Sequence, residues 1–135
     1  MFLLDTDTII YSLKGHEAVQ KNLATYIDQP MFLSVISLME LYYGAYKSKK
    51  KASNLSKIKI LEKSFEIIPS GSESAEIFGM LKTDLETSGN PLDDFDLIIA
   101  ACAMTHNLTL VTNNYRHFER IDGLKLANWS KMNKG

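Results

Sequence analysis

Acidic and amide side chains stand at the ends of four hydrophobic runs that lie far apart in the sequence. Asp5 ends the N-terminal run, and Glu40 lies shortly after the second run. Asp96 opens a third apolar segment, and Asn113 and Asn114 end the fourth run. In a parallel α/β sheet, residues just beyond the carboxyl ends of the strands converge on one crevice. We therefore expect these side chains to meet in the folded protein.

Carboxylates gathered in one crevice repel each other unless a cation lies between them. The chain offers oxygen donors at these positions and no matching set of histidines or cysteines. Hard oxygen ligands of this kind indicate magnesium or manganese. The pattern therefore points to a divalent-metal site and to phosphoryl chemistry.

Hydrophobic periodicity and turn residues predict an alternation of strands and helices. We expect strands at 2–5, 31–35, 65–68, 108–112 and 124–127, and helices at 7–14, 16–28, 37–48, 53–65, 72–87, 93–106 and 115–118. Such alternation predicts an α/β fold with a central twisted parallel sheet of four to five strands, right-handed crossovers and flanking helices. Ser37 is the expected cap of the third helix.

Length and composition fit one domain over residues 1–135, with 45% hydrophobic residues to build its core. No signal peptide or membrane-spanning stretch is expected, and the single cysteine, Cys102, fits a reducing cytoplasm. Cys102 lies in an apolar helical run, so we expect a buried and inert thiol. The inward face of the helix at 72–87 is predicted to carry Ile77, Met80, Leu81 and Leu85.

Each acidic residue also has a purely structural interpretation. Asp5 could cap the first helix, and Glu40 could face water. Asp96 precedes a run of apolar residues, where an unpaired buried carboxylate would be costly. Asp93 lies three residues before Asp96, so the two share a helix face, and Asp94 is the expected cap of that helix.

Lysines are concentrated in the segment 47–63, which contains seven of them and one acid, Glu62. The segment is either a solvated helical surface or a flank that contacts phosphates beside the acidic site. Lys47, Lys49, Lys50 and Arg116 are candidates for such phosphate contacts.

The arrangement as a whole resembles the PIN-domain ribonucleases of the VapC toxin type. The matching blocks are 3–7, 34–45, 96–101 and 110–114 with Phe118, and they occur in the order typical of that family. The ending 123–129 is also similar. This resemblance implies a single PIN-like nuclease domain.

The resemblance assigns the metal site to Asp5, Glu40 and Asp96, and the fourth catalytic position to Asn114. Asparagine at the fourth position removes one negative charge, which disfavours a tightly held second metal ion, and the number of ions, one or two, stays open. Four further residues are expected to support it: Thr6, Asp7, Asp93 and Thr112. His117 stands where some relatives carry glutamate, and its expected place is the surface.

By the same resemblance, the protein is expected to be a Mg²⁺-dependent endoribonuclease, with Mn²⁺ as a substitute, that inhibits translation and growth. A VapB-like antitoxin and a homodimer are the implied partners, beside the RNA substrate. Exposed tyrosines on the helix after Glu40, namely Tyr42, Tyr43 and Tyr46, favour such contacts, although ordinary core packing also accounts for them.

Two other functions are compatible with parts of the sequence. The run from Asp5 to Thr8 fits the Asp-x-Asp-x-Thr signature of haloacid-dehalogenase-like phosphatases, with Asp5 as nucleophile and Asp7 as acid/base. That family also needs an acidic pair at the end of a later strand, where this chain offers only Asp93 and Asp94. A non-catalytic protein-binding domain is the third interpretation, in which the acids only cap helices.

Overall fold

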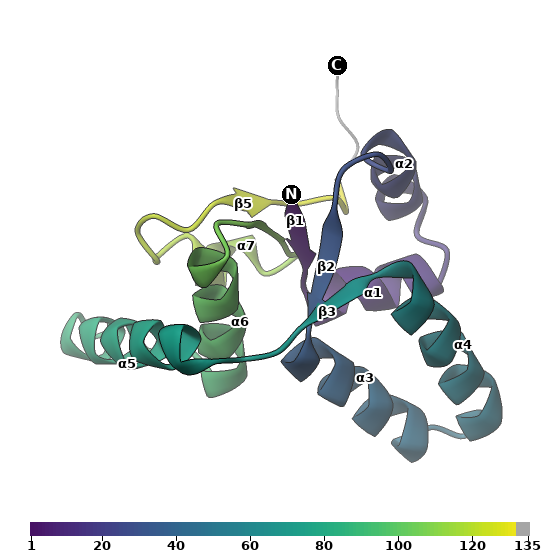
Figure 1. Ribbon diagram of the computed structural model, residues 1–135, viewed down its shortest axis with the longest axis horizontal. Helices are drawn as coiled ribbons and strands as arrows, with labels where there is room; N and C mark the ends of the chain where they lie inside the picture. The colour runs from purple at the N-terminus through teal and green to yellow at the C-terminus, as the bar shows by residue number, and fades with distance from the viewer. Residues whose placement is uncertain (132–135) are drawn as a thin grey trace.

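A five-stranded parallel sheet forms the centre of the molecule (Figure 1), and the computed structural model describes residues 1–131 of it. The strand order is β3-β2-β1-β4-β5, and every pairing is parallel. The strands are β1 (Phe2–Leu4), β2 (Met31–Ser34), β3 (Glu66–Ile68), β4 (Thr109–Val111) and β5 (Leu126–Ala127). The prediction of a parallel α/β sheet is therefore confirmed, while the predicted domain boundary at 135 falls outside the described residues.

Seven helices among the described residues connect and cover these strands. They are α1 (Thr6–Leu13), α2 (Glu17–Thr25), α3 (Val35–Lys47), α4 (Lys51–Ser64), α5 (Ser72–Thr87), α6 (Asp94–Thr105) and α7 (Tyr115–Phe118). Figure 1 shows α1 to α4 on one side of the sheet and α5 and α6 on the other. None of the helices within residues 1–131 has both the length and the apolar character that a membrane crossing demands.

Strand β1 is buried on both faces and separates two hydrophobic clusters. Leu3 packs with residues of α5 and α6, whereas Leu4 packs with residues of α1, α3 and α4. Neither side chain has any exposed surface. Successive side chains of a strand point to opposite faces, so a central strand covered by helices on both sides must be apolar throughout. This arrangement fixes the end of β1, and hence Asp5, in the middle of the molecule.

Two predicted helix caps are wrong by a few residues. Helix α3 begins directly after β2, and its cap is Ser34, whose hydroxyl accepts the N–H of Ile36 at 3.1 Å. Ser37, the predicted cap, is fully buried inside α3, and its hydroxyl has no hydrogen-bond partner among the described residues. Helix α6 is capped by Asp93, whose Oδ1 accepts the N–H of Phe95 at 2.8 Å.

Asp94, the predicted cap of α6, instead points to α5, where the Lys82 ammonium lies 3.0 Å from its Oδ1.

On helix α5 the expected burial of Leu81 and Leu85 is confirmed, but Met80 is half exposed. Met80 precedes the buried face by one residue, which turns its side chain toward solvent. Cys102 is buried as expected, and burial raises the pKa of its thiol to about 11.

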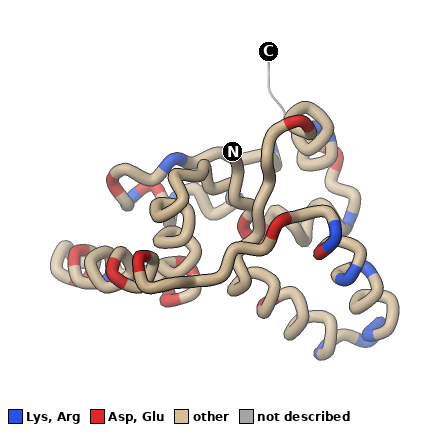
Figure 2. The backbone as a smooth tube through the Cα atoms, in the orientation of Figure 1, with Lys and Arg blue, Asp and Glu red and all other residues tan. Residues whose placement is uncertain are grey.

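Charge is distributed unevenly over the two sides of the sheet. Figure 2 shows lysines gathered on α4 and on its connection to α3, and acidic residues along α5. The molecule therefore has a basic flank and an acidic flank on either side of the edge where the strands end.

Candidate active site

The carboxyl ends of β1, β2 and β4 form one edge of the sheet, because the three strands are adjacent and parallel. Asp5 follows β1 directly, and Thr112 follows β4. Glu40 lies in the second turn of α3, which continues from β2 without a loop. Helix α6 brings Asp96 to the same edge in its first turn. Residues from four distant segments are thus brought to one place.

Asp5 is the buried centre of this cluster, with 4% of its surface exposed. Its Oδ1 accepts the N–H of Thr6, and its Oδ2 accepts the hydroxyl of Thr112, both at 2.8 Å. Burial, followed by the charge of Asp7, raises the pKa of Asp5 to about 7, and the charge of Asp96 adds to the rise. The two hydrogen bonds work against the shift. Asp5 therefore caps α1 and also belongs to the acidic cluster.

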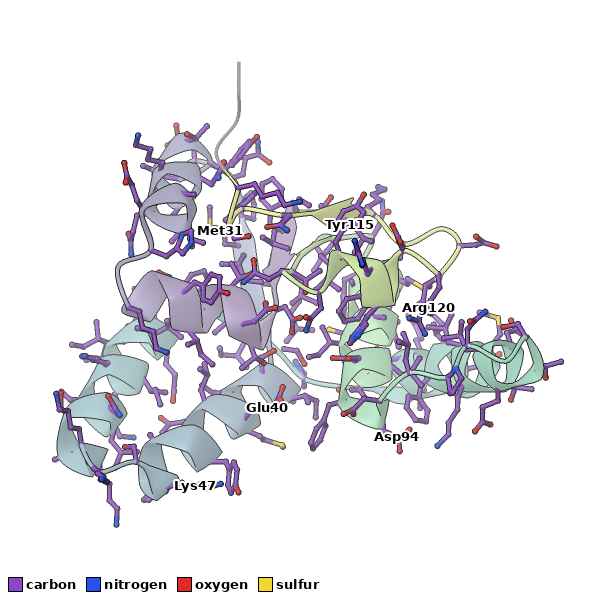
Figure 3. All side chains as sticks on the ribbon, turned by 180° about the vertical axis from the view of Figure 1, so that it is seen from behind. Met31, Glu40, Lys47, Asp94, Tyr115 and Arg120 are labelled. Carbon is purple, nitrogen blue, oxygen red and sulfur yellow. The ribbon has the colours of Figure 1, made fainter. Side chains whose placement is uncertain are left out.

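Glu40 is held toward the same centre by a long-range contact. The Thr6 hydroxyl donates to its Oε1 at 2.8 Å, which links the start of α1 to the second turn of α3. In Figure 3 Glu40 lies on the part of α3 that faces α6. The interpretation of Glu40 as a residue that only faces water is therefore wrong.

Asp96 responds electrostatically to the rest of the cluster. Burial and the charge of Asp93 raise its pKa, the charges of Glu40 and Asp7 add to the rise, and nearby His117 lowers it. Such mutual effects require the carboxylates to lie close together. Asp5, Glu40 and Asp96 therefore lie in one acidic cluster.

Asp7 is the fourth carboxylate of the acidic cluster. Its Oδ2 accepts the backbone N–H of Asn113 at 3.1 Å, and its Oδ1 accepts the Thr8 hydroxyl at 3.3 Å. Burial raises the pKa of Asp7, and its hydrogen bonds, that of the Asn113 N–H foremost, oppose the rise. Sequence reasoning gave Asp7 a supporting place but did not foresee that its charge raises the pKa values of Asp5 and Asp96.

The two asparagines after β4 lie at the same edge but differ in environment. The Asn113 amide atoms are buried and have no hydrogen-bond partner among the described residues. Asn114 is exposed, and its backbone N–H donates to the Thr112 hydroxyl oxygen at 3.0 Å. Thr112 therefore connects the fourth predicted position to Asp5. No feature of the sequence indicates the burial of the Asn113 amide, since the pattern predicts this residue only as the end of the fourth hydrophobic run.

Residues of α7 and the lysine-rich segment occupy the margins. His117 Nδ1 lies 3.8 Å from Asp96 Oδ2 while its side chain is half exposed, so its predicted surface position also borders the cluster. Arg116 is exposed on the same short helix. Lys47 lies at the far end of α3 from Glu40 (Figure 3), and Lys49 and Lys50 follow it in the chain. The structure therefore does not place these lysines beside the carboxylates.

The donor set fits a hard divalent cation, since it consists of carboxylate oxygens, and burial and nearby negative charge raise the pKa values of Asp5 and Asp96. Within residues 1–131, however, no three His, Cys, Asp or Glu side chains are already arranged around a single ion position. A bound cation would relieve the repulsion at Asp5, whose burial makes ionisation costly.

Comparison with known proteins identifies the class to which this fold and acidic cluster belong. Residues 2–124 match the PIN domain family, so the chain belongs to that family. Its relatives include "Ribonuclease VapC2" of Rickettsia felis, which is 39% identical over 133 residues, 97% of this chain and 99% of the relative. The "tRNA(fMet)-specific endonuclease VapC" of Shigella flexneri is 34% identical over 129 residues, 96% and 98% of the two chains.

Solved structures give the same result. The crystal structure of VapBC2 from Rickettsia felis bound to a promoter DNA fragment has a chain that superposes with a TM-score of 0.89 and 38% identity, covering 95% of this chain and 98% of that one. A chain of DNA-bound VapBC from Salmonella typhimurium also reaches 0.89, at 34% identity and coverages of 95% and 97%. The resemblance to VapC-type PIN domains is thus confirmed.

The phosphatase interpretation is not supported. Asp93 and Asp94 open helix α6 and do not end a strand, so the acidic pair required by that family is missing at this point. Glu40, which has no role in such a phosphatase, is instead a member of the cluster.

Proposed function

We propose that this protein is a Mg²⁺-dependent endoribonuclease and the toxin of a VapBC-type toxin–antitoxin pair. The observation that carries the proposal is the acidic cluster at the end of the parallel sheet, in which the charges of Asp7 and Asp96 act on Asp5 and those of Glu40 and Asp7 act on Asp96. The names of the relatives, which are ribonucleases and a tRNA-specific endonuclease, support RNA as the substrate. The VapBC complexes among the similar structures support a VapB-like antitoxin as the partner.

In this proposal Asp5, Glu40 and Asp96 hold the cation, with Mn²⁺ as a substitute for Mg²⁺. When bound, the cation lowers the pKa of a coordinated water and offsets the charge that develops on the phosphate. Thr112 fixes one oxygen of Asp5, and Thr6 fixes one oxygen of Glu40. The carboxylate of Glu40 or Asp96 orients the attacking water.

Because water is the nucleophile, the ribose 2′-hydroxyl takes no part in the proposed reaction. The products then carry a 5′-phosphate and a 3′-hydroxyl. Asn114 occupies the fourth position and adds no charge there. Asp7 and Asp93 supply negative charge beside the ligands without being ligands in this proposal.

The proposal includes two further points. The protein acts in the cytoplasm, where its RNA substrate resides, and it works as a homodimer. Tyr43 and Tyr46 support a protein contact, because 67% and 60% of their surfaces are exposed on α3.

Expression in a bacterial host, followed by sequencing of RNA 5′ ends, tests the function. New 5′-phosphate ends and arrested growth are expected for the wild-type protein, and neither is expected for Asp96→Asn. Co-expression of the cognate VapB-like protein should restore growth. If the wild-type protein arrests growth without new RNA ends, or if Asp96→Asn produces the same ends, the proposal is wrong.

A further inference from the structure

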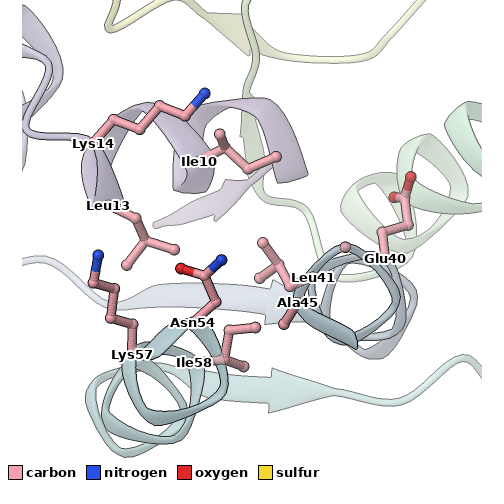
Figure 4. Close-up of a pocket in the computed structure, with 10 residues that line it drawn as sticks. Ile10, Leu13, Lys14, Glu40, Leu41, Ala45, Asn54, Lys57 and Ile58 are labelled. Carbon is pink, nitrogen blue, oxygen red and sulfur yellow. The ribbon is translucent and has the colours of Figure 1, made fainter. Parts of the chain in front are cut away.

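A groove of about 260 Å³ lies between α1, α3 and α4, and neither the acidic cluster nor the hydrophobic core accounts for it (Figure 4). Its floor is aliphatic, with Leu41, Ala45 and Ile58 almost fully buried beneath it. Ile10 and Leu13 of α1 form the opposite wall. This aliphatic surface is suited to bury a flat apolar group away from water.

The groove begins at the acidic cluster. Glu40 lines the groove and is the same side chain that accepts the Thr6 hydroxyl beside the acidic cluster. A group bound in the groove therefore lies next to the proposed cleavage site. A nucleotide next to the scissile phosphate meets this requirement.

The rim of the groove is positively charged. Lys14, which follows the last residue of α1, and Lys57 of α4 line it, and Glu40 is the one acidic residue among its lining residues. Further lysines lie along α4 (Figure 2). An anionic occupant is therefore favoured, since two ammonium groups on opposite walls complement the phosphates that flank a base.

Asn54 provides a polar group inside the groove. Its Nδ2 donates to the Ser48 hydroxyl at 3.0 Å, which fixes the amide and leaves Oδ1 and the second N–H for another partner. Figure 4 shows the amide between Leu13 and Leu41. An asparagine amide in this state can pair with the donor and acceptor on the edge of a nucleobase.

We propose that the α1–α3–α4 groove is a nucleotide subsite, which holds one unpaired base of the RNA beside the cleaved bond. The base lies on the aliphatic floor, Asn54 binds its edge, and Lys14 and Lys57 contact the neighbouring phosphates. Sequence-specific proteins read RNA mostly through such unstacked bases. The inference rests on the proposed ribonuclease function and adds the origin of its cleavage preference.

Gly44 offers a way to fill the groove without disturbing the fold. It lies on the groove wall in α3, and a Cβ placed there would meet nothing within 4 Å. Gly44→Leu should therefore fold normally and occupy the subsite. Gly79 of α5 is the matched control, since it is also helical, exposed and free of neighbours within 4 Å, on the other side of the sheet.

The experiment measures cleavage of a randomised single-stranded RNA in Mg²⁺, with sequencing of the cleaved ends. The wild type should prefer one base at a fixed position next to the cut, and kcat/KM for RNA should fall about tenfold or more in Gly44→Leu but not in Gly79→Leu. Asn54→Ala should lose the base preference by about tenfold while melting within a few degrees of the wild type. A base preference is a property that a merely structural role of Asn54 would not change.

The outcomes separate this inference from the proposed function. If the wild type cleaves RNA but Gly44→Leu and Asn54→Ala keep its rate and base preference, the subsite does not exist, although the ribonuclease stands. If Gly44→Leu cleaves normally and only escapes neutralisation by the VapB-like protein, the groove is a protein-binding site and the inference is overturned. A wild type that cleaves no RNA refutes the proposed function itself, and the inference falls with it.

Discussion

Replacement of Asp5 by asparagine should stabilise the metal-free protein at neutral and higher pH. Burial, with the charges of Asp7 and Asp96, raises the pKa of Asp5 from 3.8 to about 7. The folded state thus binds the proton of Asp5 more tightly than the unfolded state does. The free energy of unfolding therefore falls as the pH rises between about 4 and 7, on the order of 4 kcal/mol in total. Below that window Asp5 is protonated in both states and carries no penalty.

Asparagine is uncharged and cannot incur this penalty. It can still accept the Thr6 N–H through its oxygen, while its amide nitrogen must donate to the Thr112 hydroxyl, which reverses one hydrogen bond. A loss of about 1 kcal/mol is reasonable for that exchange. Asp5→Asn should then exceed the wild type by about 2–4 kcal/mol at pH 8 without metal, and the two proteins should be closely matched near pH 4.

Denaturant unfolding in the presence of EDTA, between pH 4 and pH 8, measures the effect. Asp28→Asn, at an exposed position, controls for the loss of one negative charge. In Asp5→Asn the free energy of unfolding should still fall as the pH rises, but with a smaller slope than in the wild type, because the pKa values of Asp7 and Asp96 are also raised. A metal-free wild type that becomes more stable toward pH 8, or an Asp5→Asn protein with an unchanged slope, would refute the reasoning.

Three other changes test separate parts of the site. Glu40→Gln and Asp96→Asn should each reduce RNA cleavage at least 10²-fold with melting temperatures close to the wild type, and full activity in either variant would contradict their assignment. Thr112→Val removes a hydrogen bond that lowers the pKa of Asp5 and should cost about 1–3 kcal/mol of stability. It should also move the acidic limb of the pH–rate profile upward, and an unmoved limb would argue against Asp5 as the titrating group. Alanine at 49–51 should flatten the salt dependence of RNA binding by about two units in the log–log slope, whereas an unchanged slope identifies the run as a solvated surface.

The parallel sheet and the alternation of its strands with helices were accessible from the sequence because each element leaves a local trace, whereas the strand order β3-β2-β1-β4-β5 was not predicted. The run before Asp5 is apolar without alternation, as a strand covered on both faces must be. The Gly-Asn-Pro break at 89–91 marks the loop that separates α5 from α6. Where several capping residues stand close together, however, local rules were not sufficient. Ser34 caps α3 because β2 runs straight into the helix, and this depends on the sheet.

The site was predicted as a set of residues but not as a network of contacts. Polar residues after parallel strands must converge, which identified Asp5, Glu40 and Asp96 as neighbours. The Thr6–Glu40 bond joins residues 34 positions apart, and the bond from the Asn113 N–H to Asp7 spans 106 positions. Neither contact leaves a periodic signal in the chain.

The groove was also invisible in the sequence, because it results from the packing of three helices. Its lining residues come from α1, α3 and α4, and each of these helices shows only an ordinary amphipathic or lysine-rich pattern. The sequence pattern singles out the lysines of 47–63 as one possible phosphate-contacting flank. The two lysines that line the groove are Lys14 and Lys57, however, and Lys14 lies outside that segment.

The most direct test of the central claim is the metal dependence of RNA cleavage by protein freed of metal with EDTA. We predict no cleavage in EDTA, recovery on addition of Mg²⁺ or Mn²⁺, and products that carry 5′-phosphates, with Glu40→Gln prepared in parallel to detect contaminating ribonuclease. Cleavage by the wild type that persists in excess EDTA and is absent from the Glu40→Gln preparation would contradict the claim that Asp5, Glu40 and Asp96 act through a divalent cation.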